Sequence, residues 1–266
     1  MTVTSTAAPP QPRPAAIADS LMLAGRHLRL MSRRPSSIMG AIVLPVIFAV
    51  LFFTVFGRVM DRAGIDYAQY LLPAVVIQAV FFSGMSGSVW AAEDALSGMI
   101  ARLRAMPIAR PAPVAGLLCG ETARSLLGSA VLVAIGHAFG FRFQTGFLGV
   151  LGFVGLVIAA SAAIVLPYLV LGFALADPEP AQAIGGVIYF PLLLVSTLFV
   201  PASAYPDWLR PIVENQPLSQ IVEAMRAVTT SGSVDTPTHV LIAVAWVVGS
   251  VLVFGALAPR AFGRTK

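Results

Sequence analysis

Six long apolar stretches run through this 266-residue chain, and their length constrains its fold more than any other feature. A helix needs about 20 consecutive, mostly apolar residues to cross the hydrocarbon core of a bilayer, and each stretch is long enough. Charged residues make up only 11% of the chain, whereas a soluble domain carries about 25%. The sequence therefore predicts an all-α integral membrane protein with six transmembrane helices, at residues 38–57, 67–92, 111–141, 143–176, 181–204 and 236–259.

Positive charge gathers at the two ends of the apolar region. The cationic residues there are Arg26, Arg29, Arg33 and Arg34 before the first stretch, and Arg264 and Lys266 after the last. An even number of spans puts both termini on one side of the membrane, and the positive-inside rule places that side in the cytoplasm. Because these cations are spread among sites next to the membrane, nucleic acid is not an expected partner.

The segment before the first span divides into a tail and a helix. Residues 1–14 contain four prolines and are expected to be disordered. Residues 15–34 predict an amphipathic helix in the cytoplasmic interface, although an ordinary soluble helix would show the same periodicity. Its apolar face holds Ile17, Leu21, Ala24, Leu28 and Met31, and its opposite face holds Asp19, Arg26, Arg29 and Arg33. Residues 35–266 then form the six-span domain.

The loop after the second span, residues 93–110, is expected in the cytoplasm. It begins with Glu93 and Asp94 and carries bases toward its end, an order that suits the dipole of a helix. Apolar residues recur in it at helical spacing, at Met99, Leu103 and Met106. This pattern predicts a short helix on the cytoplasmic surface, where a soluble partner could push on it. A solvated connecting loop is the alternative.

Two apolar stripes follow the fifth span, on the outer side of the predicted topology. The first is Tyr205, Trp208, Leu209, Ile212 and Val213, and the second is Leu218, Ile221, Val222 and Met225. Pro211 and Pro217 interrupt them. The stripes predict two short amphipathic helices that dip into the outer leaflet or cap a pathway.

The third span carries two charged residues, Glu121 and Arg124, which lie three apart and so share a helix face. A charge at the middle of a span costs about 2.5–3.5 kcal/mol on insertion scales, so such residues face protein or water. The pair is either a polar element of a pathway or an intrahelical pair that ties the span to its neighbours. No Cys, His and acidic residues show metal-ligand spacing, and the single cysteine, Cys119, excludes an intrachain disulfide.

These segments, in this order, resemble the ABC type-2 transporter permeases, in particular the daunorubicin-resistance-like exporters. The resemblance covers nearly everything from residue 15 onward. The loop 93–110 resembles that family's cytoplasmic coupling helix at Glu93, Gly98, Leu103 and Pro107. The stretch 201–226 resembles its outer re-entrant helices, with Tyr205, Trp208, Asn215 and Pro217, and the Gly-Phe-Arg-Phe sequence at 140–143 is also typical.

The resemblance implies a transport subunit without covalent chemistry, located in the bacterial cytoplasmic (inner) membrane. Such a permease pairs with a second permease, the same chain or a different one, and with cytoplasmic ABC ATPase subunits that bind ATP and Mg. This chain would then hold no cofactor. The interfacial helix, with Arg26, Arg29 and Arg33, and the coupling segment would contact the ATPases. The coupling residues would be Glu93, Asp94, Gly98, Arg102, Leu103 and Pro107.

The family exports hydrophobic drugs, polyketides, complex cell-envelope lipids or polysaccharides, and the short outer segment here fits a hydrophobic or amphiphilic cargo better than a long glycan. Two other classes of protein remain as alternatives. A gradient-driven carrier or channel would need several intramembrane acids or an internal repeat. A membrane-embedded enzyme would need clustered His, Asp or Cys near one interface, and the chain lacks such a cluster.

Overall fold

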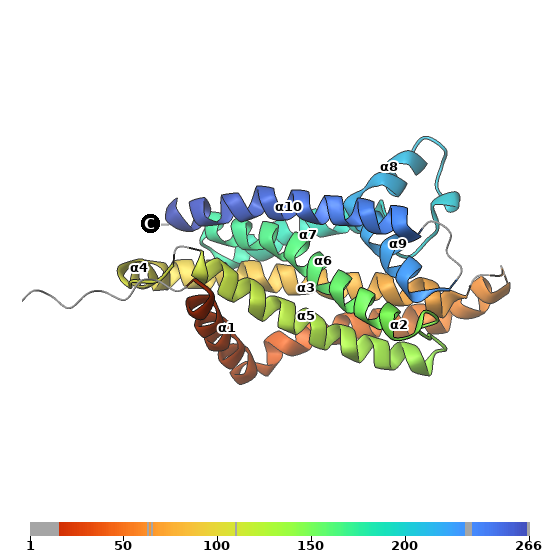
Figure 1. Ribbon diagram of the computed structural model, residues 1–266, viewed down its shortest axis with the longest axis horizontal. Coiled ribbons are helices and arrows are strands. Elements are labelled where there is room, and N and C mark those ends of the chain that lie inside the picture. Colours follow the sequence, from red (N-terminus) through yellow and green to blue (C-terminus); the bar gives the residue numbers. More distant parts are fainter. Residues whose placement is uncertain (1–15, 63, 65, 110, 232–235, 265–266) are drawn as a thin grey trace, which may run out of the picture.

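The computed structural model describes residues 16–62, 64, 66–109, 111–231 and 236–264, so the predicted tail at 1–14 lies outside the described residues. Within those ranges the chain is all-helical, with no strand (Figure 1). The helices are α1 (Ala16–Arg33), α2 (Pro35–Arg62), α3 (Tyr67–Leu96), α4 (Met99–Ala105), α5 (Ala112–Ala138), α6 (Gly146–Leu175), α7 (Pro178–Leu194), η1 (Ala202–Ala204), α8 (Arg210–Asn215), α9 (Pro217–Thr229) and α10 (Thr236–Arg264).

Within the described part of the chain, five helices are long and apolar enough to cross a membrane, namely α2, α3, α5, α6 and α10. The predicted fifth span, at 181–204, is different, because α7 has 17 residues and ends at Leu194. At 1.5 Å per residue it is about 26 Å long, somewhat less than the roughly 30 Å of a hydrocarbon core. The remaining apolar residues of that stretch leave the helix at Val195 and form turns. Apolar composition alone did not reveal where this helix ends.

α3 is the central helix of the fold. It contacts α2, α5, α6, α7 and α9, and most of its length is buried. This position explains how α3 accommodates buried polar side chains, since the neighbouring segments supply their hydrogen-bond partners. Gln78 donates from Nε2 to the Tyr189 hydroxyl at 2.9 Å, and Gln69 donates to the carbonyl of Arg142 at 2.7 Å. By contrast, α2 and α10 expose most of their apolar side chains.

Small residues allow α6 to approach α3 closely. A Cβ atom at Gly172 would lie 2.1 Å from the backbone oxygen of Ser88, far inside van der Waals contact. We expect Gly172→Ala to lower the free energy of unfolding by about 1–3 kcal/mol or more, because neither backbone is able to give way. Gly155→Ala on the same helix is the control, since its Cβ would meet nothing within 4 Å. Thermal unfolding in detergent measures both, and equal midpoints for the two variants would contradict the close packing.

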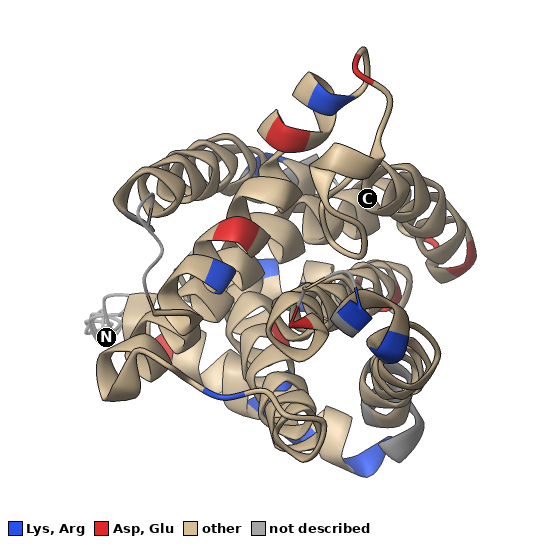
Figure 2. Cartoon of the chain, turned by 90° about the vertical axis from the view of Figure 1, so that its right-hand side faces the viewer, with Lys and Arg blue, Asp and Glu red and all other residues tan. Residues whose placement is uncertain are grey.

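The short helices lie at the two ends of the long axis (Figure 1). α1, α4 and the C-terminal end of α10 lie at one end, the α1–α4 end, where α1 runs across the bundle rather than along it. η1, α8 and α9 lie at the opposite end, the α8–α9 end. In a view onto this end, most of the ribbon carries neither acid nor base (Figure 2).

Several helix boundaries differ from the predicted spans, and two of them bear on the α1–α4 end. The first long helix begins at Pro35 and not at residue 38, and proline is favoured in the first turn of a helix. The second predicted span continues past Ala92 to Leu96, so that Glu93 and Asp94 belong to its last turn and not to the start of a separate loop helix. The break comes at Gly98, whose φ of 71° is accessible to glycine at low cost.

Candidate functional site

At the α1–α4 end, α1 is seated directly on α5. The side chains of Ala24, His27 and Met31 are buried there. Two glycines of α5 make room, because a Cβ at Gly116 would lie 2.6 Å from the Leu23 Cβ, and one at Gly120 would lie 2.3 Å from the His27 Cδ2. The apolar residues Ile17, Leu21 and Leu28, predicted to share a face with Ala24 and Met31, are instead exposed.

His27 reaches a buried ionic cluster formed by α1, α3 and α5. Its Nε2 lies 3.0 Å from Glu121 Oε1, and both side chains are almost completely buried. Glu121 also forms an ion pair with Arg124, as their spacing on the helix allows. Arg124 donates to the Ser83 carbonyl at 2.8 Å and to the Ser86 hydroxyl at 2.7 Å, both on α3. The cluster therefore joins three helices through charges that have no access to water.

Trp90 of α3 extends this cluster toward the end of the molecule. Its ring meets the imidazole of His27 edge to face at 5.2 Å, and the guanidinium of Arg34 lies over it at 4.9 Å. The two contacts place a cation and a buried histidine on the same aromatic ring. They also join the end of α1 to the last turns of α3.

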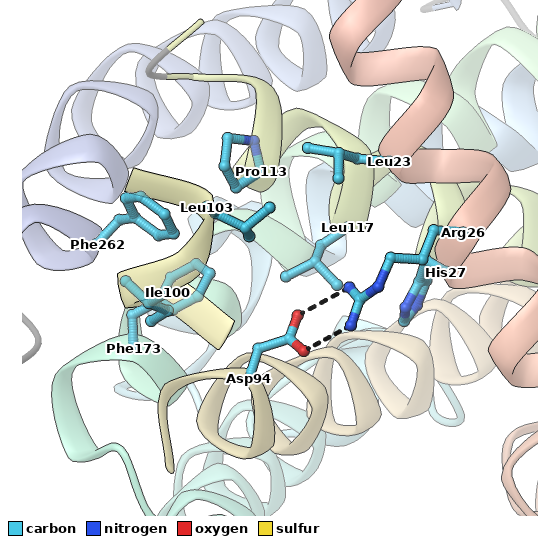
Figure 3. Close-up of a pocket in the computed structure, with 10 residues that line it drawn as sticks. All are labelled: Leu23, Arg26, His27, Asp94, Ile100, Leu103, Pro113, Leu117, Phe173 and Phe262. Atoms are coloured by element: carbon cyan, nitrogen blue, oxygen red, sulfur yellow. Dashed lines mark hydrogen bonds and ion pairs between the residues drawn. The ribbon is translucent and has the colours of Figure 1, made fainter. Parts of the chain in front are cut away.

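Two acids at the end of α3 pair with bases from the N-terminal region. Arg26 contacts both carboxylate oxygens of Asp94, at 3.2 and 3.5 Å (Figure 3). Arg34 donates to Glu93 at 3.1 Å. A carboxylate at the C-terminal end of a helix opposes the helix dipole, so these acids are poorly placed without their cations. The acids were predicted to begin the coupling helix, whereas they lie in the last turn of α3 and pair with Arg26 of α1 and with Arg34 directly after it. Their role in coupling to an ATPase stays a prediction.

α4 packs its apolar side inward through Ile100 and Leu103, whereas Arg102 is exposed. Its Arg104 donates to the carbonyl of Phe262 and lies over the Phe262 ring, so α4 is attached to α10. Figure 3 shows Ile100, Leu103 and Phe262 around the same small cavity as Arg26, His27 and Asp94. Pro107, after the helix, is exposed.

The three bases predicted for the interfacial helix have different positions. Arg26 is half-buried in its pair with Asp94, whereas Arg29 and Arg33 are exposed on α1. The backbone N–H of Ala109, beyond α4, donates to Asp19 of α1 at 3.0 Å. α1 is thus bonded to the chain before α4, at Asp94, and to the chain after α4, at Ala109.

At the α8–α9 end, the second predicted stripe is buried. Leu218, Ile221, Val222 and Met225 of α9 all pack into the main apolar core. The first stripe is divided, because Val213 is buried while Trp208 and Ile212 are exposed. Of the remaining residues predicted for this segment, Tyr205 and Pro217 are half-buried and Asn215 is exposed.

An apolar groove of about 510 Å³ lies between α6, α7, α9 and α10. This volume is within the range of about 300–1,000 Å³ that small-molecule sites occupy. The two polar side chains in its wall are engaged elsewhere, since the Tyr168 hydroxyl donates to the Gly185 carbonyl and Ser250 donates to the Ala163 carbonyl. The groove therefore presents an apolar surface, with aromatic contributions from Phe81, Trp246 and Phe254.

Two important residues were missed by sequence reasoning. His27 was omitted from the faces of the N-terminal helix, and its partner Glu121 lies 94 residues away. Arg226 was not singled out in the sequence, but it is buried. A basic residue within an otherwise apolar helical stripe was the available signal for both. Among the described residues, no group of three or more His, Cys, Asp and Glu is placed to hold a metal ion.

The fold defines a multi-pass helical membrane protein, and at its α1–α4 end polar and charged side chains join the short helices to the long ones. The model of the family described as "ABC-2 type transporter" matches residues 20–229, most of the chain, and the chain belongs to this family. It is 28% identical over 252 residues to the daunorubicin resistance ABC transporter permease protein DrrB1 of Streptomyces coeruleorubidus, covering 94% of this chain and 88% of that one. It is 29% identical over 228 residues to the doxorubicin resistance ABC transporter permease protein DrrB of Mycobacterium tuberculosis, covering 80% and 79%.

Proposed function

We propose that this chain is the permease subunit of an ATP-driven exporter, which moves a hydrophobic or amphiphilic compound outward across the bacterial cytoplasmic membrane. Family membership supports the transport role, and the names of two relatives refer to resistance to the anthracyclines daunorubicin and doxorubicin. The apolar groove supports an amphiphilic cargo over a polar glycan. ATP and Mg would bind to a separate ABC ATPase, and a second permease would complete the transport path.

One observation carries the mechanism. α1 and α4 lie at the same end and are bonded to the long helices by the side chains of Arg26, His27 and Arg104, and Arg34, directly after α1, adds a fourth such bond. Force applied to either short helix would therefore reach α3, α5 and α10. In the proposed cycle, ATP binding closes the ATPases, the α1–α4 end moves, and the permeases rearrange to open an outward route.

Purification through a tag on this chain tests the proposal. We expect an ABC ATPase to copurify, to be identified by mass spectrometry, and to hydrolyse ATP faster when doxorubicin is added to the complex in lipid. A pure permease that accumulates doxorubicin only under an ion gradient would instead indicate a gradient-driven carrier. This result would overturn the proposal.

The proposed topology puts six spans in the membrane, α7 included, with both termini in the cytoplasm and the α8–α9 end outside. In a Cys119→Ser background, we expect cysteines at Asp207 and Glu214 to react with a membrane-impermeant thiol reagent added to spheroplasts, since both side chains are exposed. A cysteine at Arg102, exposed at the other end, should react only after permeabilisation. The reverse labelling pattern would invert the topology and contradict outward transport.

A further inference from the structure

The backbone that follows α7 is held by side chains. Each of the seven carbonyl groups from Leu192 to Leu198 has a side-chain donor within hydrogen-bond distance, although the helix ends at Leu194. Non-helical backbone at membrane depth is tolerated only when protein or water satisfies its polar groups. The donors come from α3, from the α7 turn itself, from the loop before α8 and from α9, and they are Tyr70, Ser196, Tyr205, Gln216 and Arg226.

Arg226 is the centre of this arrangement. Its Nη2 donates to the carbonyls of Thr197 and Leu198 at 3.0 and 2.9 Å, and its Nε donates to the carbonyl of Tyr70 at 3.0 Å. Its Nη1 pairs with Glu223 at 2.6 Å, and its guanidinium lies 3.5 Å from the centre of the Tyr70 ring. The planar guanidinium reaches all these partners at once, which an ammonium group is unable to do.

Three other side chains strengthen the same contact. The Tyr70 hydroxyl donates to the Thr197 carbonyl at 2.7 Å, and Ser219 of α9 accepts from the Thr197 N–H at 3.0 Å. The Tyr205 hydroxyl lies 3.0 Å from the Leu194 carbonyl and 2.9 Å from that of Ser196. Burial raises the pKa of Tyr205, so its hydroxyl keeps the proton that it donates. We call Tyr70, Ser219 and Arg226, with their bonds to Thr197 and Leu198, the Arg226 clamp.

The clamp joins the two segments that wall one end of the apolar groove. Leu192, at the end of α7, lines this groove, and so do Pro217, Leu218 and Ile221, at the start of α9. The position of α9 relative to the turn after α7 therefore sets the shape of the groove at the α8–α9 end. The clamp helps to fix that position, together with the bonds from Gln216 to the Leu192 and Val195 carbonyls, since the turn has no helical hydrogen bonds of its own beyond Val195.

We propose that Arg226 is a positioning residue whose clamp holds α9 against the end of α7 and so keeps the outer end of the apolar groove closed. Release of the Thr197 and Leu198 carbonyls from the guanidinium frees α9 to move and opens this end. The contacts support the role of Arg226 in holding α9 against the end of α7, whereas the use of this clamp in export rests on the proposed function.

Thiol accessibility on α9 tests the clamp. Ala224 is buried on α9 and offers a small site for a reporter cysteine in the Cys119→Ser background. Arg226→Lys keeps the positive charge and the ion pair with Glu223 but removes the planar guanidinium, whose N–H groups donate to several carbonyls at once. We expect the reporter to react with a thiol reagent at least about tenfold faster in Arg226→Lys than in the parent, because several charge-assisted hydrogen bonds are lost from one locally opening unit. Arg58→Lys, at an exposed arginine on α2, is the matched control and should react at the parent rate.

Tyr70→Phe is the milder second variant, which keeps the ring beneath Arg226 and removes only the hydroxyl donor to Thr197. It should raise the labelling rate by a smaller factor and keeps the test decisive if Arg226→Lys fails to fold. Parent-like labelling in both folded variants, or in Tyr70→Phe alone where Arg226→Lys does not fold, would overturn the clamp. The clamp would also be overturned if a variant yields less folded protein but the folded fraction labels at the parent rate, because Arg226 would then be needed only for folding.

The effect of nucleotide on the labelling rate distinguishes a failure of the clamp from a failure of the proposed function. In the complex with the ATPase, ATP and Mg should speed labelling of the parent toward the rate of Arg226→Lys, and should add little in the variant. Faster labelling in Arg226→Lys together with a parent that ignores nucleotide would leave the clamp standing and contradict ATP-driven opening. A nucleotide response of equal size in both proteins would show that opening does not pass through Arg226, and would overturn its role as the residue that keeps the groove closed.

Discussion

Replacing Glu121 with alanine is expected to destabilise the protein by about 3–5 kcal/mol, because it leaves the buried guanidinium of Arg124 without its carboxylate. It also removes the acceptor of His27, so α1 loses its deepest bond to the long helices. Arg124→Ala should cost a similar amount by leaving Glu121 as an uncompensated buried anion. Thermal unfolding of the purified protein in detergent measures both, and Glu179→Ala, at an exposed acid on α7, should change stability by less than about 0.5 kcal/mol.

The double variant provides the decisive comparison. Removing both charges together leaves no unpaired ion, so Glu121→Ala with Arg124→Ala should be less destabilised than either single variant. Its remaining cost would be a cavity, the lost acceptor of His27 and the lost donors to Ser83 and Ser86. If the two single effects simply add, the residues are not energetic partners. Glu121 would then be a better candidate for facing the cargo route or the second permease.

Local sequence patterns were informative wherever both partners lie on one helix. The three-residue spacing of Glu121 and Arg124 indicated an ion pair as one of two alternatives, because residues three apart are neighbours on a helix surface, and the structure contains this pair. The second outer stripe likewise identifies the buried face of α9. Chain-wide composition identifies the all-helical membrane class, since too few charged residues exist to cover a soluble fold.

Contacts between segments that are far apart in the chain could not be predicted from local sequence patterns. The partner of His27 depends on how α1 lies across α5, and periodicity within residues 15–34 contains no information about that angle. The end of α7 could not be predicted for a related reason, because the stretch 181–204 is mostly apolar and its break is stabilised by donors from α3 and α9. Glu93 and Asp94 were assigned to the wrong helix because their cations come from the N-terminal region, about 60 residues earlier in the chain.

The charge pair between Glu93 and Arg34 gives the strongest test of how movement enters the permease. Both side chains are partly exposed, and such a pair stabilises by about 1 kcal/mol or less. Glu93→Arg replaces attraction by repulsion of similar size, a total change of about 1–2 kcal/mol, or roughly 5- to 30-fold in the population of joined helices. We expect Glu93→Arg to insert into the membrane normally and to lose most cargo transport and cargo-stimulated ATP hydrolysis at equal expression.

Exchanging the two charges of the Glu93–Arg34 pair distinguishes two explanations for the loss of transport. If Glu93 acts by holding α1 to α3, then Glu93→Arg combined with Arg34→Glu restores the attraction and should recover most transport. If Glu93 instead contacts the ATPase directly, as its resemblance to a coupling-helix residue implies, the second change cannot supply the missing acid and the double variant stays inactive. Wild-type coupling in Glu93→Arg alone would exclude both roles. Because the pair is solvent-accessible, its contribution should also weaken with increasing salt, which gives an independent measurement on the unmodified protein.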